Sequence, residues 1–279
     1  MSMGVEVPHE LRGLWRREVI TAPGFRDETT QVVWLQTGSW YADLRVPADR
    51  PSRPGADGFA AFGDDDLIAC AKVQGFAGQL TVADGVCYWR RDLDYQPPSS
   101  SPDEGRYSLS GDVMIEDGIH ADYQEIWRRA PESTEPAGVF RREAEDGRPG
   151  LLVIGGRFLI EVVSRSGPAS QAASLTEAVE GALAAGDRKA AEALLLTRIR
   201  FAERDQRGQW TTVLSSLSWL QGRPTWTAGA VGFDPDAGVL TTAFAGEGDR
   251  WRLLDGAAPV GELMGWLGAL EGSALGMTS

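Results

Sequence analysis

A short motif that occurs twice in the chain is the feature that most limits what it can fold into. Residues 14–18 are Leu-Trp-Arg-Arg-Glu, and residues 139–143, at an offset of 125 positions, are Val-Phe-Arg-Arg-Glu. Each copy precedes a run rich in β-branched and aromatic residues that contains glycine, at 32–47 and at 151–163. Such a run predicts two strands joined by a tight turn. We therefore expect two similar halves, because self-similarity at a fixed offset is typical of repeated structural units.

Helix and turn signals follow the first hairpin of each half. Three acidic residues at 64–66 predict a helix start, where the helix dipole favours negative charge. In the second half, residues 174–177 fit a capping box that precedes an alanine-rich segment. Strands then resume in both halves, and Asp-Gly pairs at 84–85 and 117–118 predict hairpin turns. Apolar residues spaced three and four apart within 259–270 predict a C-terminal helix.

These elements predict a mainly β fold of two tandem antiparallel barrels, each with a short helical insertion, followed by the C-terminal helix. Antiparallel meanders of about six strands commonly close into barrels, because closure removes exposed strand edges. A polar stretch with two prolines, 131–136, separates the halves. We therefore predict two domains, 1–130 and 137–279.

Four segments give the chain a resemblance to a known family. The longer two are 123–127 (Tyr-Gln-Glu-Ile-Trp) and 150–158 (Gly-Leu-Leu-Val-Ile-Gly-Gly-Arg-Phe), and weaker matches lie at 44–45 and 251–252. They resemble the fungal two-barrel lipocalin-like (calycin) proteins known as interactors of the Hrr casein kinase. The resemblance implies tandem lipocalin-like barrels, but no settled activity and no catalytic residues. The chain departs from this family in an alanine-rich insertion at 170–195.

Composition and charge exclude several classes of function. The 40 acidic residues exceed the 27 basic ones, which gives a net charge of −13. A surface this acidic repels phosphate backbones, so we expect no nucleic-acid partner. The two cysteines and two histidines lack the spacing of a structural metal site, and the chain has no nucleophile elbow or phosphate-binding loop. We therefore expect no metal and no cofactor, and whether the protein is an enzyme stays open.

No segment of the chain has the pattern of a targeting signal or a membrane span. The first ten residues lack a basic region followed by an apolar one. No apolar run approaches the ~18 residues of a spanning helix. We therefore expect a cytoplasmic protein with reduced thiols and no membrane contact.

The strands of the first half supply the candidate binding residues. Side chains alternate along a strand, so Tyr123, Glu125 and Trp127 share one face, and Arg45 lies on the polar face of an earlier strand. If Arg45 and Glu125 point outward, they are simply solvated. If both point inward, they form an ion pair or a polar anchor for a ligand, and our hypothesis is a first-barrel pocket anchored by these two residues. The remaining candidate ligand-binding residues are His120, Trp40 and Trp89.

Three kinds of function remain open. The first, favoured by analogy of fold, is a soluble protein that binds a small apolar or amphipathic ligand in a barrel pocket. The second is a cofactor-independent isomerase, cyclase or lyase that acts in the first barrel. If Glu125 points inward without Arg45 nearby, burial raises its pKa, and the carboxyl suits general acid or base chemistry. If Arg45 lies beside it, Glu125 stays ionised and serves only as a structural or ligand-binding anchor. The third is an interaction scaffold with solid-packed barrels that binds a protein partner or forms a homodimer. A cavity of ~300 Å³ or more would favour the first two.

Overall fold

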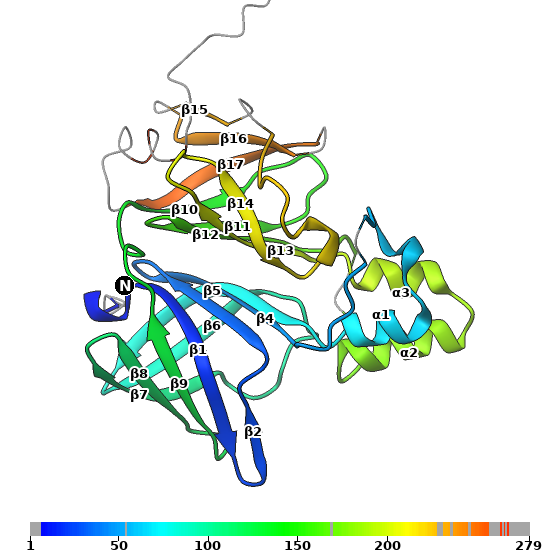
Figure 1. Ribbon diagram of the computed structural model, residues 1–279, viewed down its shortest axis with the longest axis horizontal. Helices are drawn as coiled ribbons and strands as arrows, with labels where there is room; N and C mark the ends of the chain where they lie inside the picture. The colour runs from blue at the N-terminus through cyan, green and yellow to red at the C-terminus, as the bar shows by residue number, and fades with distance from the viewer. Residues whose placement is uncertain are drawn as a thin grey trace, which may run out of the picture.

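Two antiparallel sheets dominate the structure, a computed structural model, and three helices gather at one side of the molecule (Figure 1). The structure describes residues 7–53, 55–167, 170–227, 231–234, 237–244 and 247–256, together with 263, 265 and 267. The mainly β fold predicted from the sequence is confirmed: one sheet is a closed barrel and the other is a half-barrel.

The first sheet closes because its first long strand pairs with its last. Its strands are β1 (Gly13–Ala22), β2 (Phe25–Asp27), β3 (Gln31–Gln36), β4 (Trp40–Val46), β5 (Gln74–Ala83), β6 (Val86–Asp94), β7 (Glu104–Ser110), β8 (Val113–Gly118) and β9 (Gln124–Arg129). Each strand pairs with its neighbours in antiparallel register, and β1 pairs with both β3 and β9. The short strand β2 extends the hairpin end of β1 and lies outside the closed ring. The barrel therefore has eight strands and no open edge in its ring.

The second sheet stays open over the residues that the structure describes. Its strands are β10 (Ala137–Arg142), β11 (Gly150–Gly155), β12 (Phe158–Val163), β13 (Arg198–Arg204), β14 (Trp210–Ser215), β15 (Gly232–Asp234), β16 (Val239–Phe244) and β17 (Glu247–Gly256). The edge strands β14 and β15 are joined by a segment that makes one isolated bridge, between Thr211 and Pro224. Pro224 has no backbone N–H to donate to a ladder, which disfavours a regular closing strand here.

Helices occupy the predicted insertions and begin at the predicted capping residues. They are α1 (Asp64–Cys70), α2 (Leu175–Ala184) and α3 (Arg188–Leu194), and short 3-10 turns lie at η1 (His9–Leu11), η2 (Phe59–Ala61) and η3 (Ser218–Leu220). Asp66 accepts from the backbone N–H of Gly63 at 3.0 Å, and Ser174 accepts from that of Glu177 at 3.1 Å. An Arg188–Asp64 ion pair of 2.6 Å links α3 to α1, so the two insertions form one helical group.

Three apolar cores follow from the alternation of side chains along the strands. One core fills the first barrel, another fills the concave side of the second sheet, and the largest lies between the sheets. On β4 the apolar side chains Ala42 and Leu44 face outward and pack against the second sheet. Their neighbours Tyr41 and Asp43 face the interior of the barrel, where Tyr41 belongs to the first-barrel core and Asp43 lines a cavity. Both faces of β4 are therefore buried.

The turn predicted at 117–118 is wrong. The chain turns instead between β7 and β8, where Ser110 pairs with Val113 and Gly111 adopts a φ of 60°. Glycine at the first position of a two-residue hairpin tolerates this backbone conformation. Gly118 remains in strand pairing with Gly105, and the chain reverses again over the five residues that follow. His120 therefore lies in a turn and not inside a strand as predicted.

The predicted seam falls between the two sheets. The first sheet ends at Arg129 and the second begins at Ala137, and no strand pair among the described residues joins them. The division into two domains stays a prediction, and the large core between the sheets contains residues from both. The C-terminal helix predicted at 259–270 lies mostly outside the described residues, although Leu263 and Leu267 are helical and buried in the second-sheet core. Over the described part of the chain, no helix is long and apolar enough to cross a membrane.

Candidate functional site

The interior of the first barrel contains a cavity of about 220 Å³ that combines an apolar wall with charged groups. Its apolar side chains come from five strands: Ile20, Trp34, Phe76, Trp89 and Trp127. Its polar side chains are Asp43, Arg45, Arg91, Asp103, Glu116, Tyr123 and Glu125. The cavity is smaller than the ~300 Å³ expected for a ligand pocket, so any ligand held here is smaller than a drug-sized molecule.

Arg45 and Glu125 both point into this cavity and are linked in a chain of ion pairs. Arg45 donates from Nε to Asp43 Oδ1 at 2.9 Å, and its Nη1 lies 3.7 Å from Glu125 Oε1. Arg17 donates to the same Glu125 oxygen at 2.7 Å. Asp43 and Glu125 are each only 2% exposed. The structure thus brings together the two predicted anchor residues, because the apolar face of β4 is used against the second sheet and its polar face turns inward.

Within this chain of ion pairs, the positive charges of Arg17 and Arg45 offset the negative charges of Asp43 and Glu125. Burial lowers the pKa of the Arg45 guanidinium, but the neighbouring Asp43 and Glu125 outweigh burial and raise it above its ordinary value. Burial raises the pKa of the Asp43 carboxyl, and Arg45 opposes that rise. Arg45 is therefore a permanent cation held between two acids, which suits a positioning or anchoring role.

Glu116 is a site residue that sequence reasoning missed. It lies on β8, 5% exposed, directly opposite Glu125 in the β8–β9 register. Its Oε1 accepts a 3.1 Å hydrogen bond from the Tyr123 hydroxyl. Burial, followed by the nearby Glu125, raises the pKa of Glu116 to about 8, although Arg45 opposes the rise. Met114 and Glu116 alternate as buried residues along β8, a pattern that indicates an inward-facing Glu116. Because the turn was predicted at 117–118, the start of this strand at Val113 was not recognised.

The tryptophans of the apolar wall pack edge to face. Trp34 lies 5.8 Å from Trp89 and 5.9 Å from Trp127 between ring centroids, both in T-shaped arrangements. The indole N–H groups of Trp34 and Trp127 have no hydrogen-bond acceptor among the described residues. The Arg91 guanidinium lies 3.6 Å from the centroid of the Phe76 ring. Aromatic faces and edges therefore surround the charged groups.

Two of the predicted ligand-binding residues lie elsewhere. Trp40 packs in the core between the two sheets, on the outside of the barrel. His120 is exposed in the turn after β8, where its Nε2 lies 2.9 Å from Glu104 Oε2. Tyr123, Trp89 and Trp127, in contrast, line the cavity with Arg45 and Glu125. Five of the seven predicted residues are thus gathered at one place.

A groove of about 690 Å³ borders this cavity on the outside of the barrel. The two spaces share Trp89, Arg91 and Asp103 as lining residues. Arg91 donates to Asp103 at 2.7 Å and to Asp94 at 3.0 Å. The Arg91–Asp103 ion pair therefore lies at the boundary between the barrel interior and the groove.

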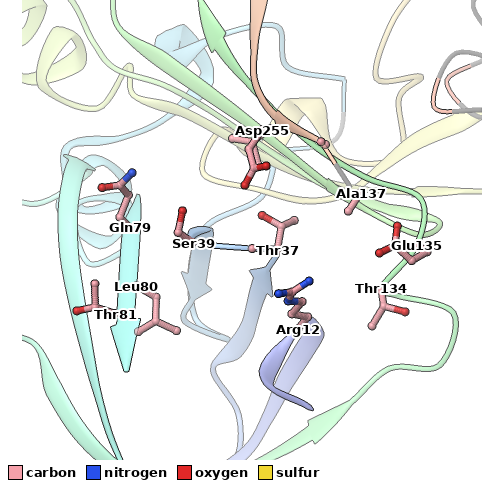
Figure 2. Close-up of a pocket in the computed structure, with 14 residues that line it drawn as sticks. Arg12, Thr37, Ser39, Gln79, Leu80, Thr81, Thr134, Glu135, Ala137 and Asp255 are labelled. Carbon is pink, nitrogen blue, oxygen red and sulfur yellow. The ribbon is translucent and has the colours of Figure 1, made fainter. Parts of the chain in front are cut away.

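A second cleft, of about 520 Å³, lies between the two sheets (Figure 2). Ser39 and Gln79 face it from the first sheet, and Asp255 faces it from the second. Its carboxylates, Glu135 and Asp255, are exposed to solvent. The barrel cavity is the stronger candidate, because burying its charged groups costs free energy that the fold must offset elsewhere. No group of three His, Cys, Asp or Glu side chains within the described ranges could hold a metal ion.

Comparisons with known proteins add little to this geometry. No family model matches the chain, and no curated protein matches it significantly. Among solved structures, the chain is similar to the crystal structure of the uncharacterized protein YLR301w from Saccharomyces cerevisiae, with a TM-score of 0.49 and 13% sequence identity. That similarity covers 88% of this chain and 99% of the other.

Proposed function

We propose that the first barrel binds a small amphipathic molecule in its interior. The observation that carries this proposal is the cavity itself, in which three tryptophans and a cluster of charged groups line the same space. In ligand pockets, apolar walls supply contact area and placed polar groups fix the orientation of the ligand. A volume of about 220 Å³ exceeds the roughly 150 Å³ of an engineered cavity that admits benzene. The ligand is therefore about the size of one substituted ring.

The resemblance to lipocalin-like proteins agrees with a ligand inside the barrel, and we keep it as part of this proposal. The cavity of about 220 Å³ is below the ~300 Å³ that would favour binding on volume alone, but it leaves the interior of the first barrel incompletely packed, unlike the solid-packed scaffold. A cofactor-independent enzyme is the second candidate, because the raised pKa of Glu116 brings a buried carboxyl into the range used for general acid catalysis. Proton NMR of a bound molecule after long incubation separates the two: an unchanged spectrum favours binding, and new signals favour catalysis.

Blocking the cavity tests the proposal. Ile20 on β1 lines the cavity, and its neighbour Thr21 points to the opposite face of the strand. We predict that Ile20→Trp abolishes binding of benzyl alcohol and of benzylamine, followed by isothermal titration calorimetry. Thr21→Trp adds the same side chain outside the cavity and is expected to leave both affinities within about threefold of wild type. Equal binding by the two variants, or no binding of either molecule to wild type at millimolar concentration, contradicts the proposal.

A further inference from the structure

The two halves of the molecule contain similar alternating chains of ion pairs, although Arg45 lies on β4 and Arg198 lies on β13. In the first barrel the order is Arg17, Glu125, Arg45 and Asp43, joined at 2.7, 3.7 and 2.9 Å. On the second sheet the order is Arg142, Asp249, Arg198 and Glu161, joined at 2.6, 2.9 and 2.8 Å. The strand registers match as well, because Arg17 is opposite Trp127 and Arg142 is opposite Trp251. An alternating chain of charges is therefore common to both halves and needs no ligand to explain it.

Glu116 is the carboxyl group that this shared chain does not explain. It is opposite Glu125 in the register, and the equivalent position opposite Asp249 is the uncharged Thr242. Thr242 accepts a hydrogen bond from the indole of Trp251, whereas Glu116 is bonded to Tyr123. The first barrel thus has a second buried acid beside Glu125, at the position where the second sheet has a threonine.

The cations of the barrel are already committed to other acids. Arg45 pairs with Asp43 and Glu125, and Arg91 pairs with Asp94 and Asp103. The cavity is lined by four carboxyl side chains and two guanidinium groups, and Arg17, which is not a lining residue, supplies a third guanidinium to Glu125 at 2.7 Å. Within the described part of the chain, no lysine, arginine or histidine lies within ion-pair distance of Glu116. The cavity therefore has an acidic excess located at Glu116.

The groups around Glu116 set what it can recognise. Five titratable or charged groups interact electrostatically with the Glu116 carboxyl. Three lie on strands: Arg45 on β4, Cys87 on β6 and Glu125 on β9. The other two are Tyr123, directly before β9, and Asp103, directly before β7. Gly105 on β7 lies directly beneath its carboxyl, since a Cβ there would approach Oε1 to 2.7 Å. The rest of the cavity surface is formed by the apolar side chains named above, together with Asp43 and Arg91. A buried carboxylate next to tryptophan faces attracts a cation that also carries apolar surface.

We propose that the ligand of the first barrel is a small organic cation, an ammonium group on an apolar body, with the ammonium at Glu116 and the apolar part against Trp34, Trp89 and Trp127. This inference rests on the proposed function and names its ligand class. Because the free Glu116 holds a proton at neutral pH, pairing with the ammonium releases that proton to solvent. Affinity for the cation therefore rises with pH from about pH 6 and levels off as the pH passes the Glu116 pKa of about 8.

Three molecules of equal size and different charge test the inference: benzylamine as its cation, benzyl alcohol and benzoate. Calorimetry on the full chain at pH 7 is expected to show benzylammonium binding at least about tenfold more tightly than the other two. Titrations in phosphate and in Tris are expected to differ in apparent enthalpy by an amount that corresponds to about one released proton per bound ligand. This measurement needs no variant and is independent of any effect on folding.

Variants locate the cation. Glu116→Gln keeps a hydrogen-bonding group next to Tyr123 and is expected to weaken benzylammonium about tenfold or more, remove the proton release and leave benzyl alcohol within about threefold. Glu116→Thr, which copies Thr242 of the second sheet, is expected to do the same. Glu18→Gln removes the same charge at an exposed position and is expected to change nothing.

Two results overturn the inference and leave the proposed function intact. One is benzyl alcohol or benzoate binding as tightly as benzylammonium; the other is a Glu116→Gln variant with unchanged benzylammonium affinity. Failure of all three molecules to bind wild type overturns the inference and the proposed function together.

Discussion

At the scale of one residue, Glu116 makes the folded protein sensitive to alkaline pH. Its pKa rises from an ordinary 4.5 in the unfolded chain to about 8 in the folded one, because it is buried and lies near Glu125. The folded chain therefore binds more protons than the unfolded chain between these values, so stability falls as pH rises from 4.5 to about 8 and is constant above. We predict that the free energy of unfolding of wild type falls by on the order of 2–4 kcal/mol relative to that of Glu116→Gln across this window.

Urea unfolding at several pH values from about 5 to about 9 measures this difference in the free energy of unfolding directly, because that range covers most of the interval between the two Glu116 pKa values. Glu18→Gln, at an exposed position, serves as the control and is expected to follow the wild-type curve. Parallel curves for wild type and Glu116→Gln would show that the buried carboxyl titrates normally.

At the scale of a strand pair, breaking the buried ion pair between β12 and β13 is expected to lower the free energy of unfolding more than breaking an exposed pair. Arg200 donates to Glu161 at 2.6 and 3.1 Å and to the Thr225 carbonyl at 2.7 Å, and both charged side chains are almost fully buried. We predict that Arg200→Gln lowers the free energy of unfolding by roughly 3–5 kcal/mol, since it leaves buried acceptors without their partner. Arg128→Gln, which breaks an exposed pair with Glu18, is expected to cost less than ~1 kcal/mol. Equal losses in chemical denaturation would contradict this distinction.

Of the two hairpin turns predicted from Asp-Gly pairs, one formed where the sequence predicted it and the other did not. The turn at Asp84 and Gly85 formed as predicted, because both residues adopt positive φ between strands that pair from Ala83 and Val86 outward. Asp117 and Gly118 have the same residue types, but the register of β7 with β8 keeps them in a strand. Local turn chemistry was sufficient only where long-range pairing agreed with it. The misplaced turn also explains why Glu116 was missed while Arg45 and Glu125 were found.

At the scale of the whole molecule, the two sheets share their largest core. Leu35 and Leu44 of the first sheet lie in one buried cluster with Val153 and Ile160 of the second. Sequence alternation showed which faces of β4 are apolar and polar, but not that the apolar face covers another sheet. The outside of a barrel is expected to meet water unless another layer buries it, and that layer is more than a hundred residues away in the chain.

A shared core predicts that both sheets unfold together. We expect differential scanning calorimetry to show one transition, which Ile160→Ala lowers as a whole by roughly 5–10 °C through loss of buried surface and the cavity left behind. Val213→Ala, at an exposed position on β14, is expected to leave the transition within about 2 °C. Two transitions of which only one moves would show that the halves unfold as separate domains.

The double burial of β4 also separates two kinds of evolutionary change. Positions 41, 43 and 45 face the barrel interior or its cavity, whereas 42, 44 and 46 face the other sheet. Substitutions at the first set alter the chemistry of the cavity, and those at the second alter how the sheets fit. The chemistry of the cavity can therefore change while the fit between the sheets is kept, although a single peptide bond separates the residues that govern each.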